Sequence, residues 1–265
     1  MNDILNSIVE RKKYNLELQK QRLKIEALQD IVVNSNFKEN EDFKFFNELK
    51  KKQPSIISEI KRASPSKGML KDKLDPILLA QEYLKGGASA LSILTEENFF
   101  AGSIKDLISV KEAVKLPILR KDFIFDEYQI WESKFIGANA ILLIAAILSD
   151  SQLKKFNTLA NDLKLNILFE VHDEEEAERI LSLNPKIIGV NNRNLKTFTV
   201  SLETSKRIIS KYKKPDSKEL WVSESGIETK QNIEELVSCG FNSFLIGETL
   251  IKSENPAKKI QELLN

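Results

Sequence analysis

The sequence contains one cysteine, Cys239, and one histidine, His172, among 265 residues. A lone cysteine cannot form a disulfide within the chain, and these two residues cannot build a Cys/His zinc cluster. We interpret Cys239, beside Gly240 at the predicted end of a helix, as a small packing residue. We interpret His172 as a loop residue without a chemical role, because it has no evident partners in the sequence. We therefore expect no metal site.

The chain also lacks an excess of charge and a long apolar run. Its 40 Lys and Arg nearly balance its 39 Asp and Glu, which gives a net charge of +1. This balance offers no broad footprint for nucleic acid or for an anionic membrane. No apolar stretch approaches the length of a membrane span, and the N-terminus shows neither the apolar core nor the cleavage site of a signal peptide. We expect a cytoplasmic protein without nucleic-acid or membrane partners.

A regular alternation of strand and helix runs from Pro54 onward. Apolar strand candidates begin near Ile56, Ala88, Leu116, Asn139, Leu165, Lys186, Glu219 and Phe241, and amphipathic segments lie at 76–84, 104–114, 127–135, 150–163, 174–183, 202–212, 230–237 and 256–264. Eight strand–helix units of this size are the repeat of a (β/α)8 TIM barrel, which belongs to the α/β class. A doubly wound open sheet is the alternative, but it more often has a glycine-rich first turn, and this chain has none.

The segment before the barrel reads as helical. Apolar residues recur among Lys, Glu and Gln over residues 2–33 without Pro or Gly, a polar stretch follows at 34–42, and a short helix is predicted at 43–49. We predict one barrel domain over 1–265, in which residues 1–50 form an N-terminal helical extension over the catalytic face.

Charged and amide side chains end several predicted strands. Active sites of this barrel lie at the C-terminal strand ends, so these residues are the candidates. They are Glu59, Lys61, Lys121, Glu170, Asn191, Arg193, Glu224 and Glu248. Glu59 and Lys61 share one face of the first strand, and a structural ion pair is the alternative for these two alone. The convergence of the whole set on one barrel mouth favours a functional site.

Two further groups of residues suit a ligand at this mouth. Ser225, Gly226 and Gly247 follow the last two strands, where barrels often bind phosphate through backbone N–H groups. Phe100 and Phe123 each follow a strand end. Either phenylalanine alone reads as a core residue, but together at a polar mouth they suit a flat aromatic ligand.

The motifs taken together resemble the indole-3-glycerol-phosphate synthase family over essentially the whole chain. The resemblance rests on the segments 4–12, 59–68, 91–96, 117–123, 170–173, 189–195, 224–227 and 245–248. The segments of the first and third strands, EIKRASPSKG and PILRKDF, are the most specific.

The resemblance implies a carboxy-lyase of tryptophan biosynthesis. Its reaction closes the ring of a phosphosugar–anthranilate substrate, 1-(2-carboxyphenylamino)-1-deoxyribulose 5-phosphate, to indole-3-glycerol phosphate, with loss of carbon dioxide and water. No metal or organic cofactor is implied. By resemblance, Lys121 is the general acid at the ribulose carbonyl oxygen, and Lys61 contacts the substrate carboxylate and shares in proton transfer. Glu170 is the catalytic carboxylate, Glu59 shares the dehydration, and Asn191 orients the substrate hydroxyls.

The resemblance also implies a set of binding residues. The substrate-binding residues are Ser64, Phe100, Phe123, Arg193, Leu195 and Glu224, and the phosphate-binding residues are Ser225, Gly226, Gly247 and Glu248. Glu248 stands where many relatives have serine, so we expect its carboxylate to turn away while the backbone N–H binds phosphate. Lysine serves as an acid near neutrality when burial and neighbouring cations depress its pKa, and we expect this of the catalytic lysines.

Two other functions fit a phosphosugar barrel. Phosphoribosylanthranilate isomerase relies on a catalytic cysteine near the first strand, and Cys239 is far from there. A catalytically silent barrel would act as a ligand-binding or scaffold protein, but the acid and base residues Lys121 and Glu170 are both present.

We expect a monomer or a weak homo-oligomer.

Overall fold

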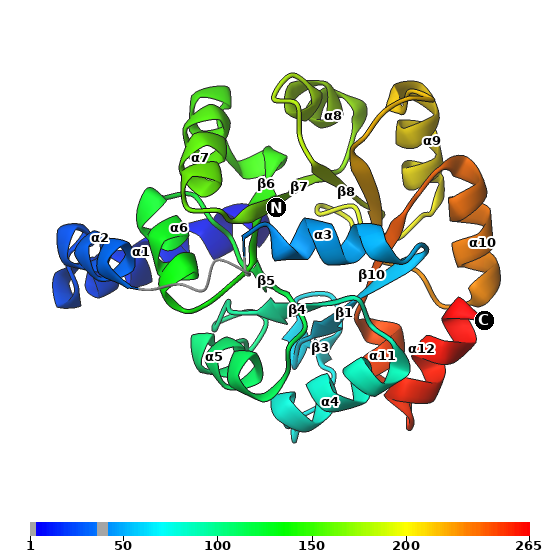
Figure 1. Cartoon of the computed structure of the whole chain (residues 1–265), viewed down its shortest axis with the longest axis horizontal. Coiled ribbons are helices and arrows are strands. Elements are labelled where there is room, and N and C mark those ends of the chain that lie inside the picture. The colour runs from blue at the N-terminus through cyan, green and yellow to red at the C-terminus, as the bar shows by residue number, and fades with distance from the viewer. Residues whose placement is uncertain (1–3, 36–41) are drawn as a thin grey trace.

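The computed structural model describes residues 4–35 and 42–265, and it is built around a closed barrel of eight parallel strands (Figure 1). The strands are β1 (Ser55–Ile60), β4 (Ala90–Leu94), β5 (Ile118–Lys121), β6 (Ala140–Ile144), β7 (Asn166–Val171), β8 (Ile187–Asn191), β9 (Leu220–Glu224) and β10 (Ser243–Ile246). Pairing of β1 with β10 closes the ring. The predicted (β/α)8 barrel is confirmed, and each strand begins within two residues of its predicted start.

A helix follows every barrel strand, as predicted. These helices are α4 (Pro76–Gly86), α5 (Ile104–Ala113), α6 (Glu127–Phe135), α7 (Asp150–Asp162), α8 (Glu174–Leu181), α9 (Glu203–Tyr212), α10 (Lys230–Cys239) and α12 (Pro256–Leu264). Three small features were not predicted: the hairpin of β2 (Ala63–Ser64) and β3 (Gly68–Met69), the 3-10 turn η2 (Ala145–Ile147), and the short helix α11 (Glu248–Ile251). Capping boxes at Asp126, Ser149 and Thr229 fix where three helices begin after their strands.

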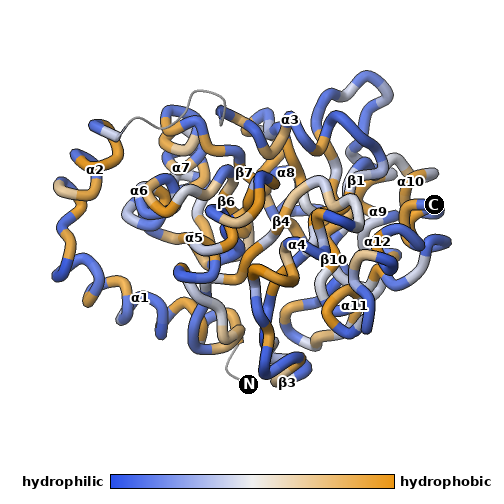
Figure 2. The backbone as a smooth tube through the Cα atoms, turned by 60° about the horizontal axis from the view of Figure 1, so that its bottom comes forward, coloured by the Kyte–Doolittle hydropathy of each residue, from blue (hydrophilic) through white to orange (hydrophobic). Residues whose placement is uncertain are grey.

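Alternation along the strands separates two apolar layers. On β1, Ile57 points into the barrel, where it packs in one cluster with Leu119, Leu168 and Leu245. Ile56 belongs to the cluster between the strands and the outer helices. Figure 2 shows the apolar strands at the centre of the molecule. The last inward position of each strand therefore rests on an apolar floor, which is a costly place for a charge.

The N-terminal extension differs from the predicted single helix over 2–33. It forms α1 (Ile4–Arg22) and α2 (Ile25–Asn34), with a break at Lys24, whose ψ of 151° is extended. The break lets both helices bury apolar residues, Leu16 of α1 and Leu28 of α2, in one cluster with Tyr128 of α6. The first two predicted helical residues and most of the predicted polar stretch lie outside the described residues.

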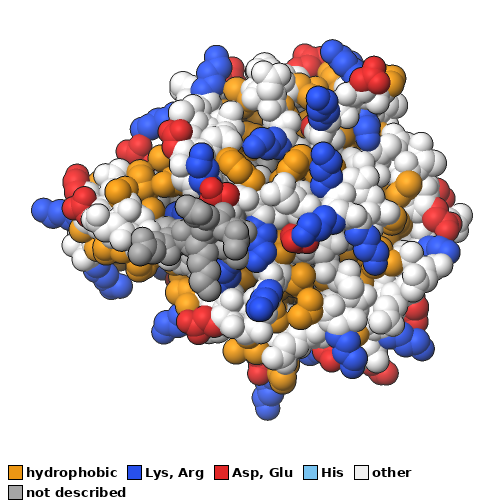
Figure 3. All heavy atoms as spheres, viewed as in Figure 1, with side chains coloured by type: hydrophobic (Ala, Val, Ile, Leu, Met, Phe, Trp, Pro, Cys, Tyr) orange, Lys and Arg blue, Asp and Glu red, His pale blue; other side chains and the backbone are white. Residues whose placement is uncertain are grey.

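The extension reaches both ends of the barrel. At the C-terminal strand ends, Lys12 of α1 lies 2.6 Å from the buried carboxylate of Asp122, so α1 covers the catalytic face as predicted. The helix α3 (Lys44–Lys51) lies instead across the opposite end (Figure 1), where Phe46 N donates to Oδ1 of Asn166, the first residue of β7. Its Phe45 is buried in the barrel interior. Figure 3, viewed onto this end, shows Lys and Arg side chains spread around α3.

Candidate active site

A cavity of about 540 Å³ opens at the C-terminal ends of the strands. The residues singled out in the sequence all line it: Glu59, Lys61, Ser64, Phe100, Lys121, Phe123, Glu170, Asn191, Arg193, Leu195, Glu224, Ser225, Gly226, Gly247 and Glu248. Ile4, Leu5 and Ile8 of α1 also line it; they belong to segment 4–12, one of those that carry the resemblance, but they were not among the predicted site residues. The volume lies within the range of small-molecule sites.

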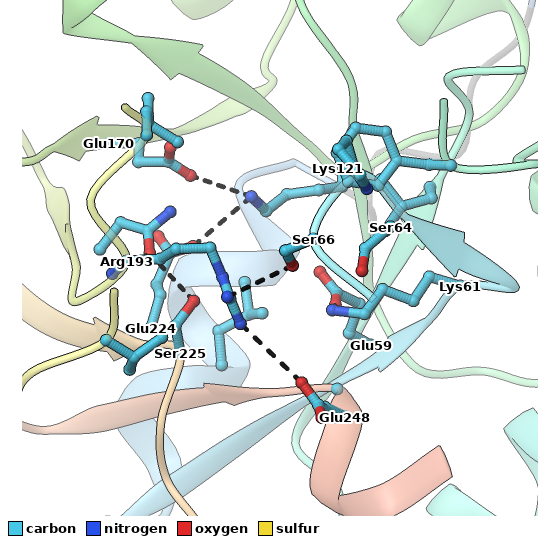
Figure 4. Close-up of a pocket in the computed structure, with 18 of the residues that line it drawn as sticks. Glu59, Lys61, Ser64, Ser66, Lys121, Glu170, Arg193, Glu224, Ser225 and Glu248 are labelled. Atoms are coloured by element: carbon cyan, nitrogen blue, oxygen red, sulfur yellow. Dashed lines mark hydrogen bonds and ion pairs between the residues drawn. The ribbon is translucent and has the colours of Figure 1, made fainter. Parts of the chain in front are cut away.

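A buried lysine joins two carboxylates across the barrel (Figure 4). Lys121, at the end of β5, places its Nζ 2.9 Å from Glu170 Oε2 on β7 and 3.6 Å from Glu224 Oε2 on β9. The two glutamate side chains are only 3% and 2% exposed, and the lysine is 15% exposed. Water therefore screens these charges weakly, and each strongly affects the ionisation of the others.

The surroundings separate the ionisation of the two carboxylates. Burial alone would raise the pKa of Glu170, but Lys121 and His172 hold it well below its ordinary value. Burial raises the pKa of Glu224 to about 8, with Glu170 acting in the same direction against the attraction of Lys121. At neutral pH Glu170 is therefore an anion, whereas Glu224 is mostly protonated. Such a separation assigns different acid–base work to two neighbouring carboxylates.

The pKa of Lys121 is raised, whereas the sequence analysis expects it to be lowered. Burial alone would lower its pKa, but the carboxylates of Glu170, Glu224 and Glu59 together raise it above its ordinary value. The sequence suggested neighbouring cations, but the ionisable groups that surround the ammonium are the carboxyl groups of three glutamates. Lys121 therefore stays charged at neutral pH.

Two glycines make room for carboxylates at the base of the cavity. A Cβ at Gly247 would lie 2.3 Å from Glu59 Oε1, and a Cβ at Gly189 would lie 2.2 Å from Glu224 Oε1. Glu59 also forms a close ion pair with Lys61. Gly247, predicted as a phosphate contact, thus also provides the space that Glu59 occupies.

The aromatic pair is held by a buried carboxylate. The ring centroids of Phe100 and Phe123 are 5.9 Å apart with an interplanar angle of 37°. Glu96, at the start of the loop after β4, accepts hydrogen bonds from the backbone N–H groups of Asn98, Phe99 and Phe100 at 2.9, 2.7 and 3.1 Å. Three bonds to one buried carboxylate fix this loop and the position of Phe100. The sequence analysis missed this residue, although its place directly after a strand end was visible.

Left-handed backbone follows β9 on the opposite side of the mouth. Ser225 and Gly226 have φ angles of 69° and 77°, and a Cβ at Gly226 would lie 2.5 Å from Val200 Cγ1. Ser225 Oγ donates to Asn191 Oδ1 at 2.9 Å, and the same oxygen accepts from the backbone N–H of Arg193 at 3.0 Å. A left-handed serine is strained, and such strain clusters at ligand sites.

The expectation that the carboxylate of Glu248 turns away from the cavity is wrong, because Glu248 lines the cavity. It lies 2.6 Å from Lys252 Nζ, 3.8 Å from Arg193 Nη2 and 4.0 Å from Lys67 Nζ. A hydrogen bond from Lys252 and the neighbouring lysines lower its pKa. The reason is the surplus of cations at this side of the mouth. Among the described contacts, the guanidinium of Arg193 otherwise donates only to neutral oxygens, Ser66 Oγ (Figure 4) and the carbonyl oxygen of Phe198.

The predicted roles of His172 and Cys239 are both wrong. His172 does follow a strand, but it has partners: its Nε2 lies 3.2 Å from Glu170 Oε1 and its Nδ1 3.1 Å from Glu176 Oε2. Its position two residues after Glu170, on the same face, is the feature that sequence analysis could have used. Cys239 ends α10 as expected, but it is exposed and is not a packing residue.

The described residues form neither a metal-binding cluster nor a membrane-spanning helix. Within residues 4–35 and 42–265, no group of three or more His, Cys, Asp or Glu side chains is arranged to hold a metal ion. Over the same ranges, no helix combines the length and the apolar character needed to cross a bilayer. The absence of a cofactor stays a prediction.

Comparison with known proteins decides the family. The sequence model of the family described as indole-3-glycerol phosphate synthase matches residues 5–263. The chain belongs to the indole-3-glycerol phosphate synthase family. A protein of that name from Acetivibrio thermocellus is 43% identical over 260 residues, which are 98% of each chain. Another of that name, from Bacteroides thetaiotaomicron, is 42% identical over 266 residues, covering 100% of this chain and 98% of the other.

Solved structures agree on the fold of this synthase-family chain. A crystal structure of 3-hexulose-6-phosphate synthase matches with a TM-score of 0.63 at 14% identity, covering 79% of this chain and 97% of that one. A mutant tryptophan synthase alpha-subunit from Pyrococcus furiosus matches with a TM-score of 0.62 at 16% identity, covering 80% and 98%. At such identities the likeness shows the barrel alone.

Proposed function

We propose that the cavity closes the ring of 1-(2-carboxyphenylamino)-1-deoxyribulose 5-phosphate to indole-3-glycerol phosphate with Lys121 as the general acid. The family membership supports the reaction. The observation that carries the assignment of roles is the buried Lys121 ammonium, held between an ionised carboxylate, Glu170, and a mostly protonated one, Glu224. This arrangement provides an acid and a base within reach of one bound molecule.

The arrangement of the strands suggests how the substrate lies. Phe123 follows β5, and Ser225 follows β9, which stands opposite β5 in the order of the closed barrel. The anthranilate ring packs beside the Phe100–Phe123 pair, and the phosphate binds at the left-handed turn of Ser225 and Gly226 and at Gly247. Arg193 supports the anionic end from β8. The ribulose chain then crosses the centre of the mouth, above Lys121.

Lys121 acts at the first chemical step. As the ring carbon attacks the ribulose carbonyl, negative charge develops on the carbonyl oxygen, and the ammonium stabilises and then protonates it. The raised pKa of Lys121 keeps the ammonium fully charged beforehand. An alkoxide is a stronger base than a lysine amine, so proton transfer is still downhill.

The remaining steps release carbon dioxide and water. Lys61 contacts the substrate carboxylate until the carbon–carbon bond breaks, and the bonding electrons then remain in the new ring system. Dehydration needs a proton on the leaving hydroxyl and a base for the proton that is lost. Glu170 is the ionised carboxylate available as the base, and the close Glu59–Lys61 pair supplies the other proton. Asn191 orients the hydroxyls.

The test is the growth of indole fluorescence when the substrate is added to the full chain with EDTA present. We expect turnover without added metal. Lys121→Ala should lower kcat by roughly 100- to 10,000-fold with a small change in KM, because it removes a positioned general acid. Lys154→Ala, an exposed lysine of α7, is the matched control. Near-normal turnover of Lys121→Ala would refute the assigned acid, and substrate binding without turnover by the unmodified chain would favour a scaffold or binding protein.

The cytoplasmic location and the monomeric or weakly oligomeric state stay predictions. Sedimentation velocity at micromolar concentration addresses the second of them directly.

A further inference from the structure

The catalytic carboxylate Glu170 has a second charged neighbour besides Lys121. One of its oxygens, Oε2, accepts a hydrogen bond from Lys121 at 2.9 Å. The other, Oε1, lies 3.2 Å from Nε2 of His172, which follows β7 directly. This second contact has the distance of an ion pair but not the alignment of a hydrogen bond. Glu170 is thus held from two sides, and only one of these sides is the proposed acid.

The imidazole is itself fixed by the next helix. Glu176, in the first turn of α8, accepts a hydrogen bond from the backbone N–H of His172 at 2.8 Å, and the same oxygen lies 3.1 Å from its Nδ1. The backbone N–H of Glu176 donates in turn to the cap residue Asp173 at 2.9 Å. Because one carboxylate oxygen holds both the main chain and the ring of His172, the ring has little freedom to rotate.

Neither residue contacts the space where a substrate would bind. His172 and Glu176 are not among the residues that line the cavity, whereas Glu170 is. The side chain of His172 is 12% exposed. Any effect of His172 on catalysis must therefore pass through Glu170.

We propose that His172 is a positioning residue, clamped by Glu176, that fixes the orientation and the negative charge of Glu170. The inference rests on the proposed role of Glu170 in the reaction. A helix-cap contact alone would require only the backbone N–H of His172 to meet Glu176. Such a contact would not require Nε2 of His172 to lie beside Oε1 of the catalytic Glu170.

The charged groups around the ring make it a cation. Both ring nitrogens face carboxylate oxygens, so each favours carrying a proton. Burial alone would lower the pKa of His172, but its contacts with Glu170 and Glu176 raise it to about 10. The other titratable groups nearby are Lys121, across Glu170, and Glu224 on β9. The imidazolium keeps Glu170 ionised and so able to act as a base.

The charge of the ring can be read directly, because this chain has only one histidine. We would label the full chain with ¹⁵N-histidine and follow the imidazole nitrogens by NMR from pH 6 to pH 10. We expect the doubly protonated form at pH 8, and a midpoint at least one pH unit lower in Glu176→Gln. Glu178→Gln, on the solvent side of α8, is the matched control and should leave the midpoint unchanged. A neutral ring that titrates near pH 6.5 in the unmodified chain would overturn the proposal.

Kinetics test whether the clamp matters for turnover. His172→Gln should lower kcat by roughly 10- to 100-fold, the effect of a misplaced catalytic group, with KM within about threefold of normal. The acidic limb of its kcat–pH profile should move to higher pH, because Glu170 loses one of two cations. Glu176→Gln should also lower kcat and move the acidic limb to higher pH, each to a smaller extent. Unchanged kcat and pH profile in both variants would overturn the proposal. Glu170→Gln serves to separate the hypotheses, since an active Glu170→Gln refutes the proposed role of Glu170 itself.

Discussion

Replacement of Gly189 by alanine would add one methyl group beside a buried carboxylate. The new Cβ would lie 2.2 Å from Glu224 Oε1 and 3.1 Å from Leu168 Cδ1. The backbone of Gly189 cannot easily retreat, because it is paired with Glu170 on one side and with Val222 on the other. The side chain of Glu224 must therefore move.

The size of the effect follows from these distances. Non-bonded heavy atoms in contact are ordinarily about 3.5 Å apart, whereas the new Cβ would lie 2.2 Å from Glu224 Oε1, so this oxygen must shift by roughly 1 Å. Overpacking of this kind costs about 1 to 3 kcal/mol of the free energy of unfolding. In a chain of this length that corresponds to a fall in Tm of about 2 to 10 °C. If Glu224 works beside Lys121 as we propose, the same displacement lowers kcat/KM by roughly 100-fold.

The assay combines thermal unfolding with indole fluorescence, and a double-mutant cycle identifies the cause. In a Glu224→Ala background the added methyl group no longer meets the carboxylate, and the 3.1 Å contact with Leu168 Cδ1 remains, so Gly189→Ala should then cost much less stability. An equal cost in both backgrounds would refute the steric argument. If Gly189→Ala has a lowered Tm but full activity, catalysis does not depend on the present position of the Glu224 side chain.

Three other perturbations have definite expected results. Glu96→Gln removes the charge from a buried side chain that accepts hydrogen bonds from three backbone N–H groups. It should therefore lower the free energy of unfolding by about 1 to 3 kcal/mol and raise KM by displacing Phe100. A KM equal to that of the unmodified chain would contradict the role of this loop. Glu248→Gln should release Arg193 and strengthen competitive inhibition by inorganic phosphate severalfold, whereas weaker inhibition would mean that the carboxylate helps to bind the anion. Finally, the pKa of His172 is raised from 6.5 to about 10, so the stability from its ion pairs is complete below pH 6.5 and is lost as the pH rises toward 10. The Tm of the unmodified chain should fall more steeply over that interval than the Tm of His172→Gln, and parallel curves would contradict this.

The barrel and the charged strand ends that line the cavity could be predicted because both follow from local patterns, whereas Ser64 and Leu195 were predicted only from the family resemblance. Apolar segments at regular spacing give strands and helices, and the period of two places Glu59, Lys121 and Glu170 on the inner face. The rule that barrel sites lie at C-terminal strand ends then brings these residues together. No knowledge of side-chain conformation is needed for either step.

The properties that sequence analysis missed depend on partners distant in the chain. The pKa of Lys121 is set by Glu170 and Glu224, which come from other strands, so its sign was not visible locally. The carboxylate of Glu248 has a local partner in Lys252 at 2.6 Å, but its contact with Arg193 at 3.8 Å comes from a residue 55 positions earlier in the chain and was not visible locally. The break at Lys24 is likewise decided by burial against α6 rather than by helix propensity.

The attachment of the N-terminal extension to both ends of the barrel has a consequence for synthesis on the ribosome. Phe45 of α3 is packed in one cluster with residues of strands as late as β10, and Lys20 of α1 pairs with Asp126 at 2.7 Å. Since α1 and α3 leave the exit tunnel before the barrel strands, they wait for most of the barrel before their apolar faces find partners. Contacts of such long sequence separation slow folding and expose apolar surface meanwhile. A chaperone thus has longer to act on the nascent extension than on the barrel strands that follow it.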